Sequence, residues 1–114
     1  MKQQKQNDQL AEFMEWERKR NTIKSCDYWA MKINGMYEFV VACNEWNPFE
    51  NWAHAGLLMD RLRFLNVHYG VWWETYEKHW VGRVGDFDEW DDNSGTTAFC
   101  LALLDYLKPI EVRL

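Results

Sequence analysis

The sequence lacks the features that mark exported, membrane-spanning and disulfide-bonded chains. It has no N-terminal apolar segment of the kind found in signal peptides, and no apolar run approaches 18 residues. Its three cysteines are odd in number and follow no recognisable spacing, so we expect reduced thiols that are mostly buried. These absences predict a cytosolic protein without a membrane partner.

The signatures of catalysis and metal binding are also missing. The sequence contains no G-x-S-x-G, H-E-x-x-H or phosphate-loop motif. No two of its histidines and cysteines lie two to four residues apart, which is the spacing of structural zinc sites. His68 and His79 could instead face each other across a hairpin as a solvent-exposed pair. We therefore predict that the protein is not an enzyme and holds no metal or other cofactor.

The chain is rich in aromatic side chains and acidic charge. Its 114 residues suffice for one domain, and 47% are hydrophobic and 17% aromatic, which favours an ordered core. The formal net charge is −5, of which residues 1–27 contribute +1 and residues 28–114 contribute −6. Such an acidic body argues against duplex nucleic acid as a partner, because neutralised phosphates supply most of that affinity.

The first part of the chain predicts a helix and a hairpin. Residues 1–7 are polar, and we expect them to be disordered. A helix capped by Asn7 or Asp8 then runs to about Arg20. Two apolar arms follow on either side of Asn34-Gly35, the strongest two-residue hairpin signal. A single short strand with an irregular lead-in is the alternative for this segment.

A second helix is expected from Asn47 to about Leu65, with Asn47 as its N-cap and Pro48 in its first position. Asn66 provides its C-terminal stop. The elements predicted next are a strand over 67–73, a return strand over 79–84, an acidic connector over 86–93 and a helix over 96–107. The last helix is apolar on nearly every side, so we expect it to be the most buried one.

Three segments of the chain carry a distinctive set of residues, which are Trp46, Asn47, Pro48, Asn51, Trp52, Ala55, Gly56, Leu57, Trp72, Trp73, Ala98, Leu101, Ala102 and Leu103. Through these residues, much of residues 8–107 resembles the phage ABA-sandwich family of small phage and prophage proteins. The segment Leu10–Trp16 is similar to the family's opening helix, which usually has glycine where this chain has Glu15.

The resemblance implies a phage-encoded accessory protein and gives no catalytic residues. We predict one α+β domain over residues 8–109, in which about three helices sandwich a small antiparallel sheet. A short tail follows over residues 110–114. In this interpretation the protein acts in the host bacterial cytoplasm.

The acidic connector Asp86–Asp92 holds five carboxylates in seven residues. Its spacing does not fit a calcium loop, because Trp90 occupies the fifth position and no glycine occupies the sixth. We expect a solvated loop or an interaction surface, with Asp88, Glu89 and Asp91 as candidate contacts.

A second candidate site lies where the last helix begins. Ser94, Thr96 and Thr97 could hold an anion with the backbone N–H groups of the first turn. Ser and Thr are also ordinary capping residues, which is the simpler interpretation of this segment.

The eight tryptophans exceed what a core of this size readily buries. Trp16, Trp52 and Trp73 fit apolar stripes, so we expect them in the core. Trp90 falls in the predicted loop, and we assign it to binding, because exposed indoles stack on bases and supply binding energy at protein interfaces. Trp72 is either a second binding residue or part of the core of a sheet covered on both faces.

Two functional hypotheses follow, both based on binding. In the first, the protein sequesters a small nucleotide-type signal and so counters host defence. In the second, it is an inhibitor or adaptor that binds a host bacterial protein through its acidic, tryptophan-bearing loop. A homo-oligomer is compatible with either hypothesis.

Overall fold

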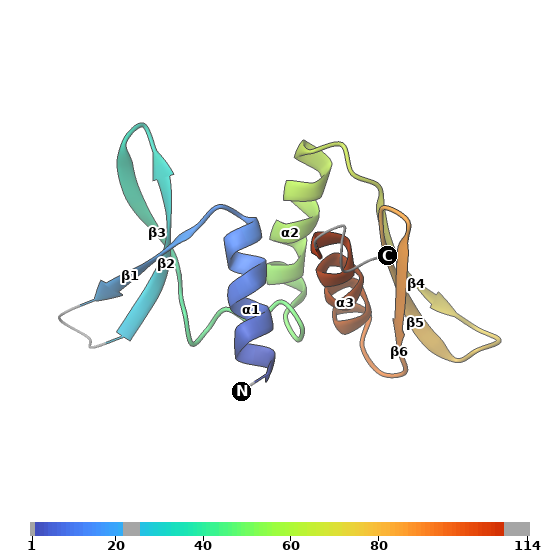
Figure 1. Ribbon diagram of the computed structural model, residues 1–114. Helices are drawn as coiled ribbons and strands as arrows, with labels where there is room; N and C mark the ends of the chain where they lie inside the picture. Colours follow the sequence, from blue (N-terminus) through green and yellow to red (C-terminus); the bar gives the residue numbers. More distant parts are fainter. Residues whose placement is uncertain (1, 22–25, 109–114) are drawn as a thin grey trace. The chain divides into compact units, whose positions relative to one another are not determined.

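The computed structural model describes residues 2–21 and 26–108. In chain order the elements are α1 (Lys2–Phe13), β1 (Glu17–Asn21), β2 (Cys26–Ile33), β3 (Met36–Ala42), α2 (Trp52–Phe64), β4 (Tyr69–Glu74), β5 (His79–Val84), β6 (Phe87–Asp91) and α3 (Gly95–Leu107). The chain forms two compact units, residues 1–47 and residues 48–114. The strands pair into two three-stranded antiparallel sheets, one in each unit (Figure 1).

The prediction of an α+β fold with small antiparallel sheets is confirmed. The sequence had suggested a single sheet, whereas the described strands divide between two, β1-β2-β3 and β4-β5-β6. The predicted tail, residues 110–114, and the predicted domain end at Pro109 lie outside the described residues.

Helix α1 begins and ends earlier than predicted. It already includes residues 2–7, which were expected to be disordered, and it ends at Phe13 rather than near Arg20. The chain leaves the helix through Glu15, whose φ of +63° lies in the left-handed region that favours glycine. Residues 17–21 then pair with β2 as strand β1.

The predicted hairpin around Asn34-Gly35 is confirmed as β2 and β3. Asn34 has φ +52° and Gly35 has φ +82°, so both turn residues adopt the positive φ that a type I′ turn requires. Ile33 and Met36 flank the turn as partners, and the register shifts once farther along, between Trp29 and Ala30.

Trp46 is the largest fully buried side chain of the N-terminal unit. Its indole Nε1 donates a hydrogen bond to the backbone O of Asn7 at 2.8 Å, and its ring meets Trp16 edge-on at 4.9 Å between centroids. Because Asn7 lies within α1, this hydrogen bond ties the polar first half of the helix into the folded unit. The expectation that Trp16 belongs to the core is confirmed.

Helix α2 starts at Trp52, five residues after the predicted N-cap. The N-cap is Asn51, whose side chain accepts hydrogen bonds from the backbone N of Ala53 at 2.9 Å and of His54 at 3.2 Å. Asn47 therefore does not cap the helix. The carbonyl of Phe49 accepts hydroxyl hydrogen bonds from the start of α3, which holds the segment before Asn51 in a turn. The predicted stop at Asn66 is confirmed by its φ of +59°.

Helix α3 covers one face of the sheet β4-β5-β6 (Figure 1). The two elements approach so closely at Gly82 that a Cβ there would lie 2.4 Å from the backbone of Ala98 and Phe99. Seven of the thirteen residues of α3 are buried, compared with three in α2, so the prediction that the last helix is the most buried is confirmed.

The acidic stretch is a strand and not a connector. Residues 87–91 form β6 and pair with β5 from Val84↔Phe87 to Trp80↔Asp91. The residues alternate, since Phe87, Glu89 and Asp91 lie on the side of α3. The charge density of this stretch indicated a loop, but its period of two is the pattern of a half-buried strand.

Candidate functional site

The strongest candidate site is the face of the sheet β4-β5-β6 that is turned away from α3, called the open face below. Gly82 touches α3, so its strand neighbours Val81 and Arg83 point to the opposite side. The strand register then identifies the residues of β4 and β6 that lie on the same face. Its residues are Gly70, Trp72 and Glu74 on β4, His79, Val81 and Arg83 on β5, and Asp88 and Trp90 on β6.

A row of apolar side chains crosses the open face from edge to edge. Trp72 pairs with Val81, and Val81 pairs with Trp90, so the three residues lie side by side on adjacent strands. Trp90 is 63% exposed and Trp72 is 38% exposed. Two large indoles thus flank one β-branched residue on a surface that no described helix of this unit covers.

A charged pair fixes one side of this row. Arg83 donates to Asp88 through Nε at 2.6 Å and through Nη2 at 2.9 Å, a bidentate contact between β5 and β6. The hydrogen bond from Arg83 lowers the pKa of Asp88 below its usual value. The guanidinium carbon also lies 5.9 Å from the ring centroid of Trp72, whose indole extends over Gly70. Arg83 is therefore held between Trp72 and Asp88.

A histidine lies on the other side of the row. His79 stacks on Trp90 with 6.0 Å between ring centroids and 23° between planes, and its strand partner is Glu74. The predicted pairing of His68 with His79 is wrong, because His68 lies before β4 and its carbonyl accepts from the backbone N of Gly85 at 2.7 Å.

The three candidate carboxylates of the acidic stretch do not lie on one face of the sheet. Only Asp88 lies on the open face beside Trp90, while Glu89 and Asp91 lie on the side of α3. The Asp91 side chain accepts from the backbone N of Asn93 at 2.9 Å and of Ser94 at 2.8 Å. Asp91 thus holds the backbone of the two residues that precede α3.

Glu89 forms a carboxyl pair with Asp105 of α3. A hydrogen bond with Asp105, together with burial, raises the pKa of Glu89 to about 7. Burial acts to raise the pKa of Asp105, but hydrogen bonds from Glu89 and Lys108 lower it overall. Lys108 Nζ lies 2.9 Å from Asp105 Oδ1. Below about pH 7 Glu89 is therefore protonated beside an ionised Asp105, beneath β6.

The hydroxyls predicted to hold an anion are engaged within the unit. Ser94, Thr96 and Thr97 all donate to the carbonyl of Phe49, at 3.4 Å from Ser94 and 3.1 Å from Thr97. Ser94 is the N-cap of α3, since its Oγ accepts from the backbone N of Thr97 at 3.1 Å. These hydroxyls therefore cap the helix. The carboxylate of Asp91 lies next to them, and its negative charge disfavours an anionic ligand at the start of α3.

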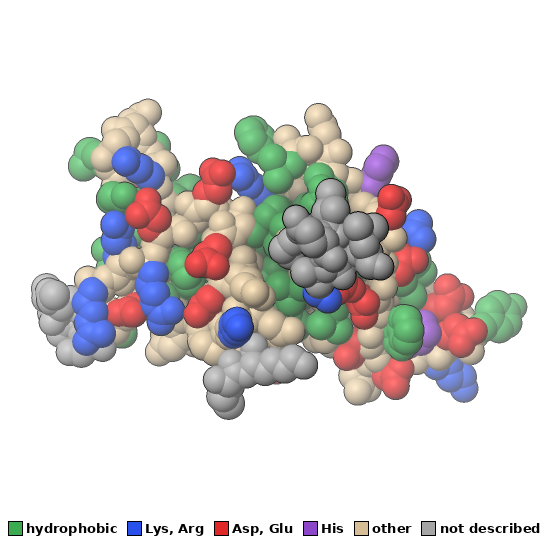
Figure 2. Space-filling model, in the orientation of Figure 1, with side chains coloured by type: hydrophobic (Ala, Val, Ile, Leu, Met, Phe, Trp, Pro, Cys, Tyr) green, Lys and Arg blue, Asp and Glu red, His purple; other side chains and the backbone are tan. Residues whose placement is uncertain are grey.

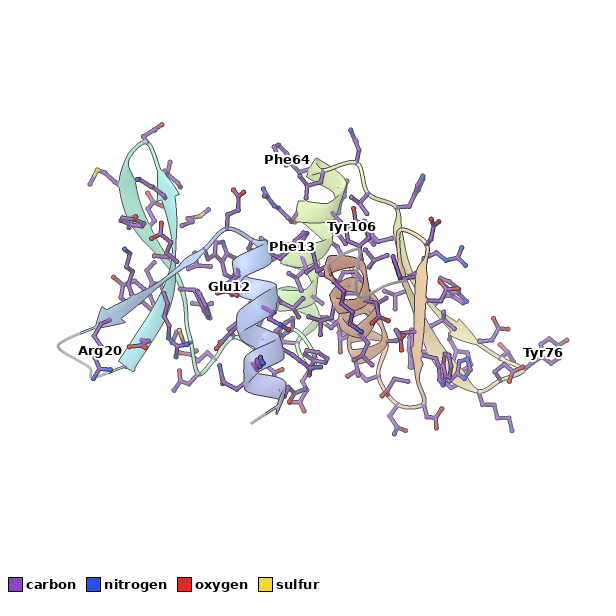
Figure 3. All side chains as sticks on the ribbon, viewed as in Figure 1. Glu12, Phe13, Arg20, Phe64, Tyr76 and Tyr106 are labelled. Carbon is purple, nitrogen blue, oxygen red and sulfur yellow. The ribbon has the colours of Figure 1, made fainter. Side chains whose placement is uncertain are left out.

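Two other tryptophans, Trp52 and Trp73, differ from their predicted positions. Trp52 is 53% exposed and Trp73 is also exposed, although both were expected in the core. Each meets Trp80 edge-on, at 6.2 Å from Trp52 and 5.8 Å from Trp73. They lie at the margin of the covered side of the sheet. On that side Tyr106 of α3, which is labelled in Figure 3, packs against Phe87 with the two rings edge-on.

The sequence nominated Trp72, Trp90 and Asp88 as candidates, but not the β5 side chains that lie beside them. His79, Val81 and Arg83 alternate with Trp80 and Gly82, and this period of two was the signal that could have revealed them. Figure 2 shows acidic side chains gathered over the sheet of the C-terminal unit, with hydrophobic ones among them.

Within residues 2–21 and 26–108, no three His, Cys, Asp or Glu side chains are grouped closely enough to hold a metal ion. None of the helices in the same ranges is long and apolar enough to cross a membrane. No family model, curated protein or solved structure matches the chain.

Proposed function

We propose that this chain is a non-catalytic binding protein whose open face docks onto a protein partner. The observation that carries the proposal is the row Trp72–Val81–Trp90, which crosses all three strands of the sheet. Tryptophan is the residue type most enriched among the side chains that dominate binding energy at protein interfaces. Arg83 and Asp88 add a polar rim that is already internally paired.

The charge of the C-terminal unit favours a basic partner surface. Residues 48–114 carry six basic and eleven acidic side chains, whereas residues 1–47 carry seven of each. Arg83, the cation of the open face, is neutralised by Asp88. Long-range attraction would therefore draw a positively charged surface to the open face and repel nucleic acid.

We propose further that the protein is a phage- or prophage-encoded inhibitor or adaptor that binds a host protein in the bacterial cytoplasm. This part rests on the resemblance of Trp46, Pro48, Trp52 and Gly56 to the phage ABA-sandwich family.

Affinity purification from a bacterial lysate tests the proposal with three baits. They are the unaltered chain, Trp90→Ala, and Phe64→Ala as a matched control on an exposed aromatic of α2. We expect a protein that the unaltered and control baits retain and that Trp90→Ala loses, with retention falling as salt rises. Equal capture by all three baits would argue against the open face.

Sequestration of a nucleotide-type signal stays a prediction. The hydroxyls first assigned to it donate to Phe49, so a ligand of this kind would have to bind elsewhere. Thermal unfolding with a panel of linear and cyclic nucleotides is the direct check, because a ligand that binds only the folded chain raises its Tm. No shift with any nucleotide would leave protein binding as the hypothesis to pursue.

A further inference from the structure

The two outer strands of the sheet β1-β2-β3 differ sharply in charge. Four of the five residues of β1, Glu17–Asn21, are charged. Strand β3, Met36–Ala42, is two residues longer and carries one charged residue, Glu38. Charged side chains on an edge strand discourage pairing with another chain, so β1 is protected in this way and β3 is not.

Strand β3 also exposes apolar side chains beside its open edge. Met36 is 73% exposed and Phe39 is 65% exposed. Phe39 lies on the same sheet face as Ala30, its partner on β2, and its ring is 5.4 Å from the ring of Tyr28. A seven-residue segment with strong β propensity, low charge, and neither proline nor glycine is a typical template for strand addition.

We propose that β3 pairs antiparallel with β3 of a second copy of this chain, so that two three-stranded sheets join into one of six strands. A two-fold axis perpendicular to the new sheet passes between the two strands, midway between the two copies of one residue, which then face each other. With Phe39 at that position, the strands overlap from Met36 to Ala42, and Val40, which the register shift leaves without a partner on β2, lies inside the overlap.

The pattern of side chains favours self-pairing centred on Phe39. In that register Glu38 lies opposite Val40 of the other copy, and Tyr37 lies opposite Val41, so no like charges meet. The two Phe39 rings lie across from each other, a favourable cross-strand pair. A centre at Glu38 would instead oppose two carboxylates.

Self-pairing of β1 is disfavoured by the same reasoning. An antiparallel pair centred on Lys19 would place two ammonium groups opposite each other and Arg18 opposite Arg20. Lys19 and Glu17 are also engaged with Tyr37 of β3, at 3.8 Å from the Lys19 nitrogen to the ring centroid and 2.9 Å between Tyr37 Oη and Glu17 Oε2. The edge open to a second copy is therefore β3.

Sedimentation velocity of the full chain over a concentration series tests the proposal. We expect the mass to rise with concentration from 13.8 kDa towards twice that value. Phe39→Lys places two cations opposite each other and should keep the chain monomeric at concentrations where the unaltered chain is a dimer. Phe64→Lys is the matched control, because it changes another exposed phenyl ring, on α2, and should leave dimerisation intact.

Circular dichroism of each variant establishes that it folds, and hydrogen exchange gives a second readout that needs no substitution. In the unaltered chain, exchange of the β3 amides should slow as concentration rises, while exchange of the β1 amides stays the same. A monomer up to ~1 mM would overturn the proposal. A dimer that Phe39→Lys leaves unchanged would also overturn it. Trp90→Ala changes the open face and not β3, so it should leave the mass of the unaltered chain unchanged.

Discussion

Arg83 and Asp88 meet through two hydrogen bonds of 2.6 and 2.9 Å between adjacent strands, and the same guanidinium lies beside the ring of Trp72. This contact links the central and outer strands of the open face. It also fixes the polar side of the tryptophan row before any partner arrives, which lowers the ordering cost of binding.

The first prediction concerns Asp88→Asn, which removes the charge and keeps the shape. Because Arg83 lowers the folded pKa of Asp88 below the ordinary 3.8, the ionised carboxylate stabilises the fold above that pH. The stabilisation is lost as pH falls through the lower folded value. We expect a small drop in Tm at pH 7 that disappears in strong acid, measured by thermal unfolding against pH. A Tm difference that stays constant across this range would contradict the assignment.

The second prediction tests the contact between α3 and β5. Gly82→Ala would place a Cβ 2.4 Å from the backbone of Ala98 and Phe99, so the helix must move away from the sheet. We expect a loss of ~3 kcal/mol or more in the free energy of unfolding, measured by urea denaturation. Gly56→Ala in α2 is the control, because nothing lies within 4 Å of its added Cβ. It should stabilise the protein by up to ~1 kcal/mol.

The third prediction follows from the carboxyl pair of Glu89 and Asp105. The folded pKa of Glu89, about 7, lies above its ordinary 4.5, so folding takes up a proton between these values. The protonated group stabilises the fold fully below pH 4.5, and this contribution is lost as pH rises through about 7. Glu89→Gln keeps a donor without titrating. We expect the free energy of unfolding of Glu89→Gln, relative to that of the unaltered chain, to increase as the pH rises from 5 to 8.

Urea denaturation of both proteins at each pH provides the measurement for Glu89. Asp105→Asn is a useful companion, since it removes the carboxylate that holds the shared proton and should flatten the same pH dependence. If the unaltered chain and Glu89→Gln follow parallel curves over this range, the carboxyls do not share a proton.

The fourth prediction concerns the start of α2. Asn51→Ala removes the side chain that accepts from Ala53 and His54, which should cost ~1 kcal/mol of stability. Asn51→Ser retains a capping oxygen and should cost much less. Chemical denaturation distinguishes the two, and equal losses would mean that Asn51 does not act through its cap.

Sequence patterns predicted the elements whose causes are local. Asn34-Gly35 determines its own turn through positive φ, and Ser94 caps the helix that follows it directly. The choice of Asn51 over Asn47 is different, because both residues can cap a helix. It depends on the Phe49 carbonyl, whose hydroxyl donors lie more than forty residues away in the sequence.

The candidate site was predicted only in part for the same reason. The sequence indicated exposure of Trp90 and a role for Asp88, but it placed both in a loop with Glu89 and Asp91. Pairing of β6 with β5 separates these carboxylates onto two faces. It also brings His79 to Trp90 and Arg83 to Asp88, contacts that no spacing along the chain specifies.

Binding of a partner protein through the open face is tested most directly by a titration of the purified partner. The protein captured by the unaltered bait is titrated calorimetrically with the unaltered chain, with Trp90→Ala and with Phe64→Ala. We predict that Trp90→Ala raises Kd by about 30-fold or more. This corresponds to the ~2 kcal/mol of binding free energy that is lost when a dominant interface tryptophan is truncated. Phe64→Ala should bind like the unaltered chain. Equal affinity of all three proteins would contradict the account, because binding would then not involve Trp90.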